Sequence, residues 1–514
     1  MIDASENQQS VIDTQQKKIG SEANRKWLEN VSQAVEWKPT HDGIYNLVVI
    51  GGGPAGLVAA ASAAGLGAKV ALIESNKMGG DCLNAGCVPS KSLIQAARKH
   101  TGKQEGYPQS IHSIKRDDFD AVMENLRQTR AKLSEHDSID RFRKLGVDVF
   151  IGHGKFCGKD KIIVNETTLR FRKAMIATGA TASTLMVPGA KEVNFHTNET
   201  IFDIEALPKS LIVIGGGTIG CEMSQAFTRL GSKVTQIEKS GHLLSREDTD
   251  ASSILLQTFI REGTDVRLNT SVQSLSQRGT TKYVSVVEDG KEKEISAEEI
   301  LVCVGRSPNV NGLELEEAGI SFDTKTGIQV NDFLQTTNPR VFAAGDVASL
   351  ERFTHAADFM ARIVVQNALF LGKRRLSSLT IPRCTYTVPE IGHVGIGSNA
   401  GTESKSFVTT QTIFFSEVDR ASIDGDTQGF VRIHLKKGTD QIMGATVVNP
   451  NAGELISMIT LAMTNRIGLK KIASTIFPYP TRSEAIRKLG DQYNRTRLTP
   501  RILKIFKKWL QWNR

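Results

Sequence analysis

The sequence has few cysteines and few prolines for its length. It contains six cysteines and 14 prolines among 514 residues, and its first residues lack the apolar stretch of a signal peptide. A disulfide-rich secreted scaffold needs many more cysteines, and a proline-rich fibrous chain needs many more prolines. These absences favour a globular protein that keeps its thiols reduced in the cytoplasm.

Acidic residues are missing from the last part of the chain, residues 495–514. Seven basic residues there supply most of the formal charge of +9, which falls to +2 without them. The rest of the protein is almost neutral, so a nucleic-acid-binding surface is not expected. The seven residues are Arg495, Arg497, Arg501, Lys504, Lys507, Lys508 and Arg514.

Glycine is abundant, and the length points to several domains. A chain of 514 residues with 45 glycines predicts about three domains that bring backbone close to ligands. Residues 47–73 are long and apolar enough to cross a bilayer, but a β-branched run, a glycine cluster and an alanine-rich run predict strand, turn, helix and strand. Residues 211–238 repeat this βαβ pattern.

Each βαβ unit carries a GxGxxG motif between its first strand and its helix, and ends in a glutamate. Such a turn places a pyrophosphate at the helix N-terminus, and the acid binds a ribose hydroxyl. One motif alone is weak evidence, but two at the same spacing predict two dinucleotides and electron transfer between them. The first set is Gly51, Gly53, Gly56 and Glu74, and the second is Gly215, Gly217, Gly220 and Glu238.

Cys82 and Cys87 stand close together in the segment GGDCLNAGCVPSK. They are a redox-active pair, half of a metal site, or two buried thiols. A zinc site needs two further ligands at short spacing, and none flank the pair, so no metal is expected. A helix predicted to begin beside Cys87 lowers the pKa of its thiol. The other cysteines are expected in the core: Cys157, Cys221, Cys303 and Cys384.

The segment around the cysteines resembles the active-site signature of the pyridine nucleotide-disulfide oxidoreductases. ATGA at residues 177–180, VGRSPN at 304–309 and AAGDV at 343–347 follow in the order of that family, and the resemblance covers residues 44–497. It implies an α/β fold with two Rossmann-like dinucleotide-binding domains, for FAD and for NAD(P), and a C-terminal α+β domain that pairs two subunits into a homodimer.

Composition and resemblance together predict the domain boundaries. A helical extension that contains Trp27 and Trp37 precedes the first domain. The expected parts are the extension over 1–43, FAD-binding segments over 44–190 and 314–380, an NAD(P)-binding domain over 191–313, a dimerisation domain over 381–497 and a basic amphipathic tail over 498–514.

The resemblance also implies roles for individual residues. Cys87 is the thiol beside the flavin, and Cys82 is the outer thiol that attacks the substrate. Lys91 lies near flavin N5 and pairs with Glu222. Asp346 holds the ribityl chain of FAD. Further cofactor contacts are implied for Glu74, Lys91, Gly154, Thr178, Gly179, Val347 and Gly305.

The residue at the end of the second βαβ unit bears on the choice of nicotinamide nucleotide. A carboxylate at Glu238 binds ribose hydroxyls and repels a 2′-phosphate, which favours NADH. Basic residues at this place are typical of NADPH-binding versions, and Lys239, His242 and Arg246 follow closely. NADPH therefore stays the alternative.

The chain departs from the family at its C-terminal motif. Disulfide reductases carry His-Pro-Thr followed by a glutamate, whereas this chain has Tyr479 before Pro-Thr and then Glu484. Tyrosine, with a reference pKa of about 10, is a poor base at neutral pH, so rapid turnover of lipoamide or glutathione is not expected. Tyrosine here resembles mercuric reductase, although no cysteine follows Cys384 and no N-terminal CxxC domain is present.

These observations predict an NAD(P)H-dependent, mercuric reductase-like FAD oxidoreductase with a redox-active disulfide. Its electron acceptor is a soft metal ion, a quinone or another small electrophile. In the homodimer the segment with Tyr479 and Glu484 would complete the partner's active site. The alternatives are dihydrolipoamide dehydrogenase and, of another class, a membrane-docked redox sensor or electron-transfer partner.

The tail PRILKIFKKWLQWNR has the pattern of an amphipathic helix. Ile502, Leu503, Phe506, Trp509 and Leu510 recur at helical spacing on one face, and basic residues occupy much of the remainder. One interpretation is peripheral contact with an anionic membrane, at its inner face in the cell. The other is packing on the protein's own body, against the N-terminal helix with Trp27 and Trp37.

Overall fold

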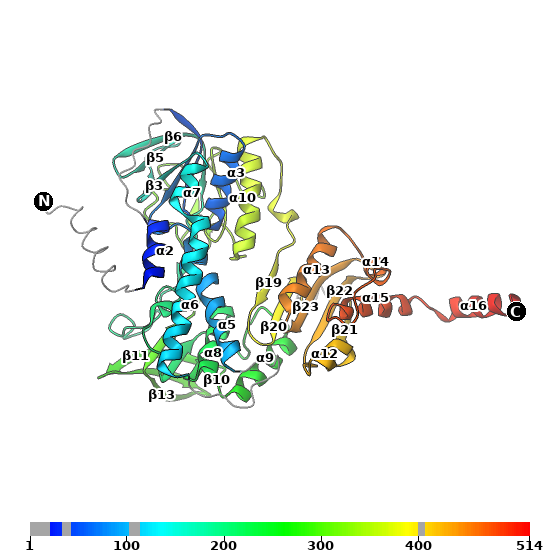
Figure 1. Ribbon diagram of the computed structural model, residues 1–514. Coiled ribbons are helices and arrows are strands. Elements are labelled where there is room, and N and C mark those ends of the chain that lie inside the picture. The colour runs from blue at the N-terminus through cyan, green and yellow to red at the C-terminus, as the bar shows by residue number, and fades with distance from the viewer. Residues whose placement is uncertain (1–20, 33–42, 102–113, 399–406) are drawn as a thin grey trace.

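The computed structural model describes residues 21–32, 43–101, 114–398 and 407–514. It has the predicted α/β fold, in which two nucleotide-binding lobes lie above one another and a third, C-terminal lobe lies beside them (Figure 1). Trp37 lies outside the described residues. No helix in these ranges is long and apolar enough to cross a membrane.

The first lobe is built on a seven-stranded sheet of strand order β3-β2-β1-β6-β5-β4, with β18 paired to β6. Strands β1, β2, β3, β6 and β18 are parallel, and their apolar side chains are almost all buried because helices cover the sheet. The elements are β1 (Ile44–Ile50), α3 (Pro54–Gly65), β2 (Val70–Glu74), β3 (Val147–Ile151), β4 (Gly154–Phe156), β5 (Lys161–Val164), β6 (Thr167–Ile176), β18 (Val341–Ala343) and α10 (Thr354–Leu369).

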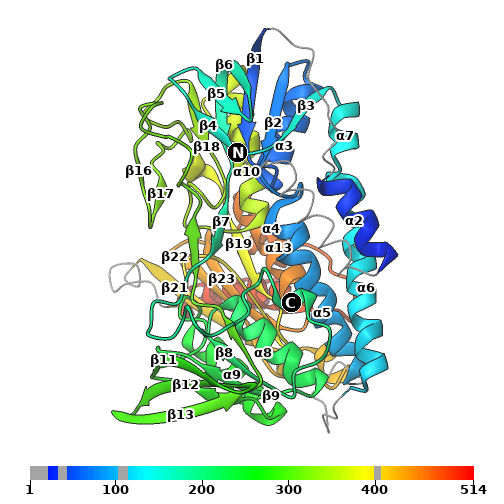
Figure 2. The same ribbon diagram turned by 90° about the vertical axis from the view of Figure 1, so that its left-hand side faces the viewer.

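The second lobe repeats the parallel arrangement. Its four-stranded sheet has the order β10-β9-β8-β14, and a three-stranded antiparallel sheet β11-β12-β13 lies at its outer end (Figure 2). The elements are β8 (Ser210–Ile214), α8 (Thr218–Leu230), β9 (Lys233–Ile237), α9 (Thr249–Glu262), β10 (Asp265–Arg267), β11 (Thr270–Arg278), β12 (Thr281–Glu288), β13 (Lys291–Ala297) and β14 (Glu299–Val302).

Helices from the N-terminal part of the chain join the two lobes. The cysteine segment forms α4 and the start of α5. Helix α5 packs against both α6 and α8, so it connects the first lobe with the helix that follows the second glycine turn. Helix α2 lies along α6 and near α7 in both views (Figures 1 and 2). The bounds are α2 (Glu22–Ser32), α4 (Gly80–Asn84), α5 (Cys87–His100), α6 (Arg116–Ser134) and α7 (Ile139–Lys144).

The C-terminal lobe has an antiparallel sheet of order β19-β20-β23-β22-β21 with helices packed against it. After α15 the chain leaves this lobe and forms α16, which extends away from the body (Figure 1). The elements are β19 (Pro382–Thr385), β20 (Glu390–Gly395), β21 (Val408–Phe414), α12 (Asp419–Ile423), β22 (Phe430–Lys436), β23 (Ile442–Asn449), α13 (Ala452–Thr464), α14 (Leu469–Ala473), α15 (Glu484–Thr496) and α16 (Pro500–Trp512).

Short elements complete the chain between these lobes. They are η1 (Glu135–Asp137), β7 (Ala180–Ala182), η2 (Ile201–Asp203), β15 (Arg306–Pro308), β16 (Phe322–Asp323), β17 (Gly327–Ile328), η3 (Leu376–Ser378) and η4 (Phe415–Glu417).

Candidate active site

The two glycine turns have the same geometry. Gly51 and Gly215 have φ values of +110° and +120°, and a Cβ atom would lie 2.3 Å from the carbonyl oxygen of Ala177 and 2.4 Å from that of Cys303, respectively. Only glycine fits at either position. Gly53 and Gly217 are the N-caps of α3 and α8, so the helix N-termini begin where each turn ends.

The last glycine of each motif lets the helix pack on its turn. A Cβ atom at Gly56 would lie 1.8 Å from the carbonyl oxygen of Gly51, and one at Gly220 would lie 2.1 Å from that of Gly215. Both βαβ units therefore form the close turn that a pyrophosphate-binding site requires, at the N–H groups of a helix start.

Glu74 and Glu238 hold these turns from the side. Glu74 accepts hydrogen bonds from the backbone N–H of Gly52 at 2.6 Å and Asn76 at 2.7 Å. Glu238 accepts the equivalent bonds from Gly216 at 2.5 Å and Ser240 at 2.7 Å. Burial raises the pKa of Glu74. A carboxylate has about four acceptor positions, so each glutamate still has capacity for ribose hydroxyls.

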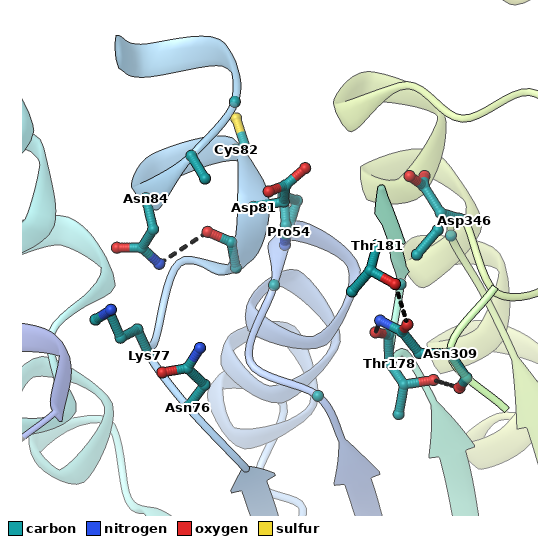
Figure 3. A pocket seen from close by; sticks show the side chains of 18 of the residues that line it. Pro54, Asn76, Lys77, Asp81, Cys82, Asn84, Thr178, Thr181, Asn309 and Asp346 are labelled. Carbon is teal, nitrogen blue, oxygen red and sulfur yellow. Dashed lines mark hydrogen bonds between the residues drawn. The ribbon is translucent and has the colours of Figure 1, made fainter. Parts of the chain in front are cut away.

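One cavity of about 4520 Å³ connects the first glycine turn with the cysteine pair and the second glycine turn. Cys82, Asp81 and Asn84 face Thr178, Asn309 and Asp346 across it (Figure 3). Sequence-predicted residues that line the cavity are Gly51, Gly53, Glu74, Cys82, Cys87, Lys91, Gly154, Thr178, Gly179, Gly217, Glu222, Gly305 and Asp346.

Other predicted cofactor residues do not line this cavity. Gly56, Gly215, Gly220 and Glu238 belong to the turns just described but are not part of the cavity lining. Val347 is buried in the core of the first lobe, and its carbonyl accepts a hydrogen bond from Ile328 at 2.8 Å. Its backbone, not its side chain, is what remains close to the Asp346 site.

The cavity fits FAD. Asp346 lines it, and burial raises the pKa of this carboxyl group, whose ion-pair partner Arg306 lies 3.6 Å away. A half-buried carboxylate with spare acceptor capacity suits a ligand with several hydroxyl groups, such as a ribityl chain. The glycine turn, the Asp346 carboxyl group and the thiols all line this cavity, so its chemistry suits FAD.

Cys82 and Cys87 are free cysteines in the structure and share a hydrogen bond. The bond from Cys82 is the main cause that lowers the pKa of Cys87 to about 6, with Thr354 and the charge of Lys91 acting in the same direction against burial. Thr354 Oγ1 lies 3.4 Å from the Cys87 Sγ. The pKa of Cys82 is raised by the same bond and by burial. Cys87 is therefore the thiolate of the pair and Cys82 carries the proton.

Lys91 and Glu222 form the ion pair expected from the sequence, with 2.8 Å between Lys91 Nζ and the Glu222 carboxylate. Glu222 is buried, with 2% of its side chain exposed, and its other oxygen accepts a hydrogen bond from the backbone N–H of Tyr386 at 2.9 Å. The Tyr386 ring centroid lies 4.8 Å from Lys91 Nζ. Sequence reasoning missed Tyr386, because no local pattern marks a contact between residues 164 positions apart.

Two further residues complete the cavity without having been predicted. Arg306 binds Asp81 at 2.7 Å beside the cysteine segment and lies 3.6 Å from Asp346 on the opposite wall. Asn309 donates a hydrogen bond to the carbonyl oxygen of Thr178 at 2.9 Å and so connects two segments on the side of the cavity opposite the cysteines (Figure 3). Both residues belong to the VGRSPN motif, so the sequence marked this segment. It did not show which distant residues Arg306 and Asn309 contact.

Helix α2 forms part of the cavity wall. The side chain of Trp27 is 5% exposed, and its indole N–H donates to Asn84 at 2.8 Å, two residues from Cys82. The guanidinium of Arg130 lies 3.7 Å from the ring centroid and the Lys77 ammonium 5.1 Å. Helix α2 therefore lines one side of this cavity.

Tyr479 and Glu484 do not reach the cysteines of their own chain. The side chain of Tyr479 is 70% exposed and donates its hydroxyl proton to Asp419 at 2.9 Å, which raises the pKa of the phenol. Glu484 is buried in the C-terminal lobe and binds Arg487 at 3.1 Å. Neither residue lines the large cavity.

The expectation that four cysteines are core thiols is wrong for one of them. Cys157 is exposed, because it follows β4 in a surface connection, whereas Cys221 is buried and Cys303 and Cys384 are partly buried. Within the described ranges no three His, Cys, Asp or Glu side chains are grouped so that they could hold a metal ion.

Two dinucleotide turns that share one cavity with a thiol pair define a redox enzyme of the two-nucleotide class. The chain belongs to the pyridine nucleotide-disulphide oxidoreductase family, whose profile matches residues 45–361, and the family's dimerisation domain matches residues 381–489. Enzymes of this family use FAD and NAD(P)H, and so does this chain.

Relatives with two different names match most of the chain. It is 31% identical to a mercuric reductase of Staphylococcus aureus, over 87% of this chain and 82% of that protein. It is 33% identical to a dihydrolipoyl dehydrogenase of Thermus scotoductus, over 87% of this chain and 97% of that protein.

Two solved structures have the same fold. The Cu(II) complex of the HOCl-induced flavoprotein disulfide reductase RclA from Escherichia coli has a TM-score of 0.77 at 26% identity, covering 88% of this chain and 99% of that one. LpdA from Mycobacterium tuberculosis has a TM-score of 0.79 at 27% identity, covering 87% of this chain and 99% of that one.

Proposed function

We propose that the chain is an NAD(P)H-dependent FAD oxidoreductase of mercuric reductase type, which passes electrons through Cys82 and Cys87 to a soft metal ion or another small electrophile. The observation that carries this proposal is the hydrogen-bonded pair of thiols beside Lys91, in a cavity that both dinucleotide turns share. The homologous mercuric reductase of S. aureus supports the class of acceptor.

FAD, when bound, takes a hydride equivalent from the reduced nicotinamide and delivers an electron pair to a disulfide. Breaking the Cys82–Cys87 bond with two electrons and one proton gives one thiolate and one thiol. Cys87 is the sulfur that keeps the negative charge, because Cys82 and Thr354 donate hydrogen bonds to it and Lys91 is nearby. Cys82 keeps the proton, as its raised pKa requires.

The shared hydrogen bond also gives a way to activate the outer sulfur. If the proton moves from Cys82 to Cys87, Cys82 becomes the nucleophile without help from a third base. A soft metal ion binds thiolates directly and replaces their protons, so no proton has to be delivered to a leaving thiol. This chemistry suits a site in which tyrosine stands where the family has its histidine base.

The partner subunit completes the site in this proposal. Tyr479 is exposed on the C-terminal lobe, whose sequence matches the family's dimerisation domain. An exposed phenol there is available to the cavity of a second chain, and the partner subunit's Tyr479 would then approach Cys82 of this one.

NADH is the proposed electron donor. Two of the basic residues that would favour NADPH are engaged elsewhere: Arg246 binds Glu351 at 2.7 Å and His242 contacts the carbonyl oxygen of Leu243 at 3.0 Å. Glu238 faces the second glycine turn, where the backbone N–H groups of Gly216 and Ser240 donate to its two carboxyl oxygens. This balance favours a nucleotide without a 2′-phosphate.

A screen of electron acceptors tests the proposal. The FAD-loaded enzyme would be mixed with NADH and Hg²⁺, Cu²⁺, a quinone, lipoamide or oxidised glutathione, and NADH oxidation would be followed in native enzyme and in Cys82→Ser. We expect the metal ions to be reduced fastest and Cys82→Ser to lose that activity. Rapid reduction of a quinone by both proteins, with no turnover of the metal ions, would show that the thiols are bypassed and would overturn the proposal.

Dihydrolipoamide dehydrogenase is the second candidate, favoured by the 33% identity to the T. scotoductus enzyme. Turnover of lipoamide needs a base for proton transfer, and removing one costs about 10²- to 10⁴-fold in rate. Asp419 raises the pKa of the Tyr479 phenol, so less of it is deprotonated, and thus able to accept a proton, at neutral pH than in a free tyrosine. Fast reduction of lipoamide in the same screen would favour this candidate.

A further inference from the structure

Helix α16 has no buried residue, although the chain specifies it well. Pro500 occupies the first turn, and the Thr499 side chain caps the helix by accepting a hydrogen bond from the backbone N–H of Ile502 at 3.4 Å. The helix extends away from the C-terminal lobe (Figure 1). An isolated helix this short has little stability in water. Its apolar face therefore needs a contact that the described part of the chain does not supply.

The apolar and basic residues of α16 separate completely around its axis. At about 100° per residue, the apolar side chains fill a continuous arc of about 180° and the cations lie together in an arc of about 120°. The apolar arc holds Ile502, Leu503, Ile505, Phe506, Trp509, Leu510 and Trp512, and the opposite arc holds Arg501, Lys504, Lys507, Lys508 and Gln511.

The described part of the body does not cover this apolar arc. One interpretation of the sequence was that the tail packs against the N-terminal helix. Trp27 of that helix is buried, donates a hydrogen bond to Asn84 and lies under the guanidinium of Arg130. Trp512 is 79% exposed, and the ring of Trp509 lies 5.7 Å from that of Trp512. Packing of the tail on α2 beside Trp27 is wrong, because α16 has no buried residue and extends away from the body (Figure 1). Trp37, the other tryptophan of that interpretation, lies outside the described residues.

We propose that α16 binds the surface of an anionic lipid membrane and attaches the enzyme to it as a peripheral protein. The apolar arc would lie among the acyl chains, and the lysines at its borders would reach the headgroups with their ammonium groups. Trp509 and Trp512 at the C-terminal end suit the headgroup region. The proposal goes beyond the redox activity and does not depend on it.

The charge of the tail favours a membrane over another protein surface as the partner of α16. Residues 495–514 carry seven basic residues and no acid, so a second copy of α16 would face this helix with the same charge. Protein interfaces are also depleted of lysine in their cores. Anionic lipid offers both an apolar layer and negative charge in the geometry that the two arcs of α16 require.

The test is sedimentation of the FAD-loaded full chain with lipid vesicles. One set contains phosphatidylglycerol mixed with phosphatidylcholine, and the other contains phosphatidylcholine alone, each at low and at high salt. We expect the chain to sediment with the anionic vesicles at low salt, to be released at high salt, and to stay in solution with the neutral vesicles. A chain that ends at Thr499 should stay in solution throughout.

Two triple variants distinguish the charge of α16 from the net charge of the whole protein. Lys504→Gln with Lys507→Gln and Lys508→Gln should weaken binding about 100-fold, since each lysine near an anionic surface contributes about fivefold. Lys291→Gln with Lys325→Gln and Lys437→Gln removes the same charge from exposed positions elsewhere and should bind as the native chain does. FAD absorbance and the circular dichroism spectrum confirm that each variant is folded.

Three outcomes would overturn the membrane assignment. Equal sedimentation of the full and shortened chains would exclude α16 as the contact. Equal binding to neutral and anionic vesicles would exclude the role of charge. A change of oligomeric state on truncation in the absence of lipid would show that a second copy of the chain covers the apolar arc.

Discussion

The Lys91 ammonium and the Glu222 carboxylate meet at 2.8 Å and join the two halves of the redox site. Lys91 lies one turn into α5, after Cys87, and Glu222 lies in α8, after the second glycine turn. Since α5 also packs along α8, the thiol pair of one lobe is fixed relative to the nucleotide turn of the other. Lys91 is thereby held where its charge stabilises the Cys87 thiolate.

The first prediction concerns the pKa of Cys87, which is lowered to about 6. In the two-electron-reduced, FAD-loaded enzyme, a thiolate beside the flavin gives a long-wavelength absorbance band. We expect this band to be half-developed near the pKa of Cys87, to be fully present above that pH and to disappear as pH falls, since protonation of Cys87 removes the thiolate. An absorbance titration measures the midpoint.

Two variants check that prediction. Lys91→Gln should move the midpoint to higher pH, because it removes a positive charge that favours the thiolate. Cys87→Ser should lack the band at every pH. A midpoint near the value of an ordinary cysteine, about 8.5, in the native enzyme would contradict the proposed role of Cys87.

The second prediction concerns nucleotide choice. Native enzyme should use NADH with a higher kcat/KM than NADPH, and Glu238→Gln should narrow the difference about tenfold by removing the charge while keeping an oxygen for the backbone N–H of Gly216. Glu238→Ala should narrow it as well but also loosen the turn, seen as a higher KM for both nucleotides. Native preference for NADPH would show that Lys239 and its neighbours dominate instead.

The third prediction concerns the shared active site. As a homodimer, Cys82→Ser should lose turnover, because it lacks the attacking sulfur. The Tyr479→Phe homodimer should lose up to about tenfold, because it lacks one hydrogen-bonding hydroxyl beside Cys82. In the proposed dimer, a mixed dimer regains one native site, so random mixing of the two chains by co-expression should restore about a quarter of native activity. A Tyr479 that acts in its own chain would give no recovery, because each site would then carry one substitution.

The fourth prediction concerns the N-terminal helix. Trp27→Ala removes a buried ring beside Arg130 and the hydrogen bond to Asn84, so the enzyme should release FAD more readily. Truncation of a buried tryptophan typically costs about 3–5 kcal/mol of stability. FAD retained after gel filtration and the temperature of flavin release measure the effect. Trp512→Ala, at an exposed position, is the control and should retain FAD normally.

The fold and the two glycine turns were predictable because their signals are local. Alternating strand and helix patterns with glycine at fixed spacing define βαβ units. At Gly51 and Gly215 a side chain would clash with the backbone of the neighbouring segment, so glycine is required there. The ion pair between Lys91 and Glu222 followed only from the family resemblance, since the two residues are 131 positions apart. The contacts of Tyr386 had no comparable signal.

The C-terminal tail and the first lobe show which features the sequence determines and which depend on the tertiary structure. The sequence alone determined that residues 500–512 form an amphipathic helix, because the Thr499 cap, Pro500 and the apolar spacing all act within a few residues. Only the tertiary structure decided that Trp27 is buried beside Asn84 and that Trp509 is exposed. Burial depends on which distant surfaces fit together, and periodicity along the chain does not encode that fit.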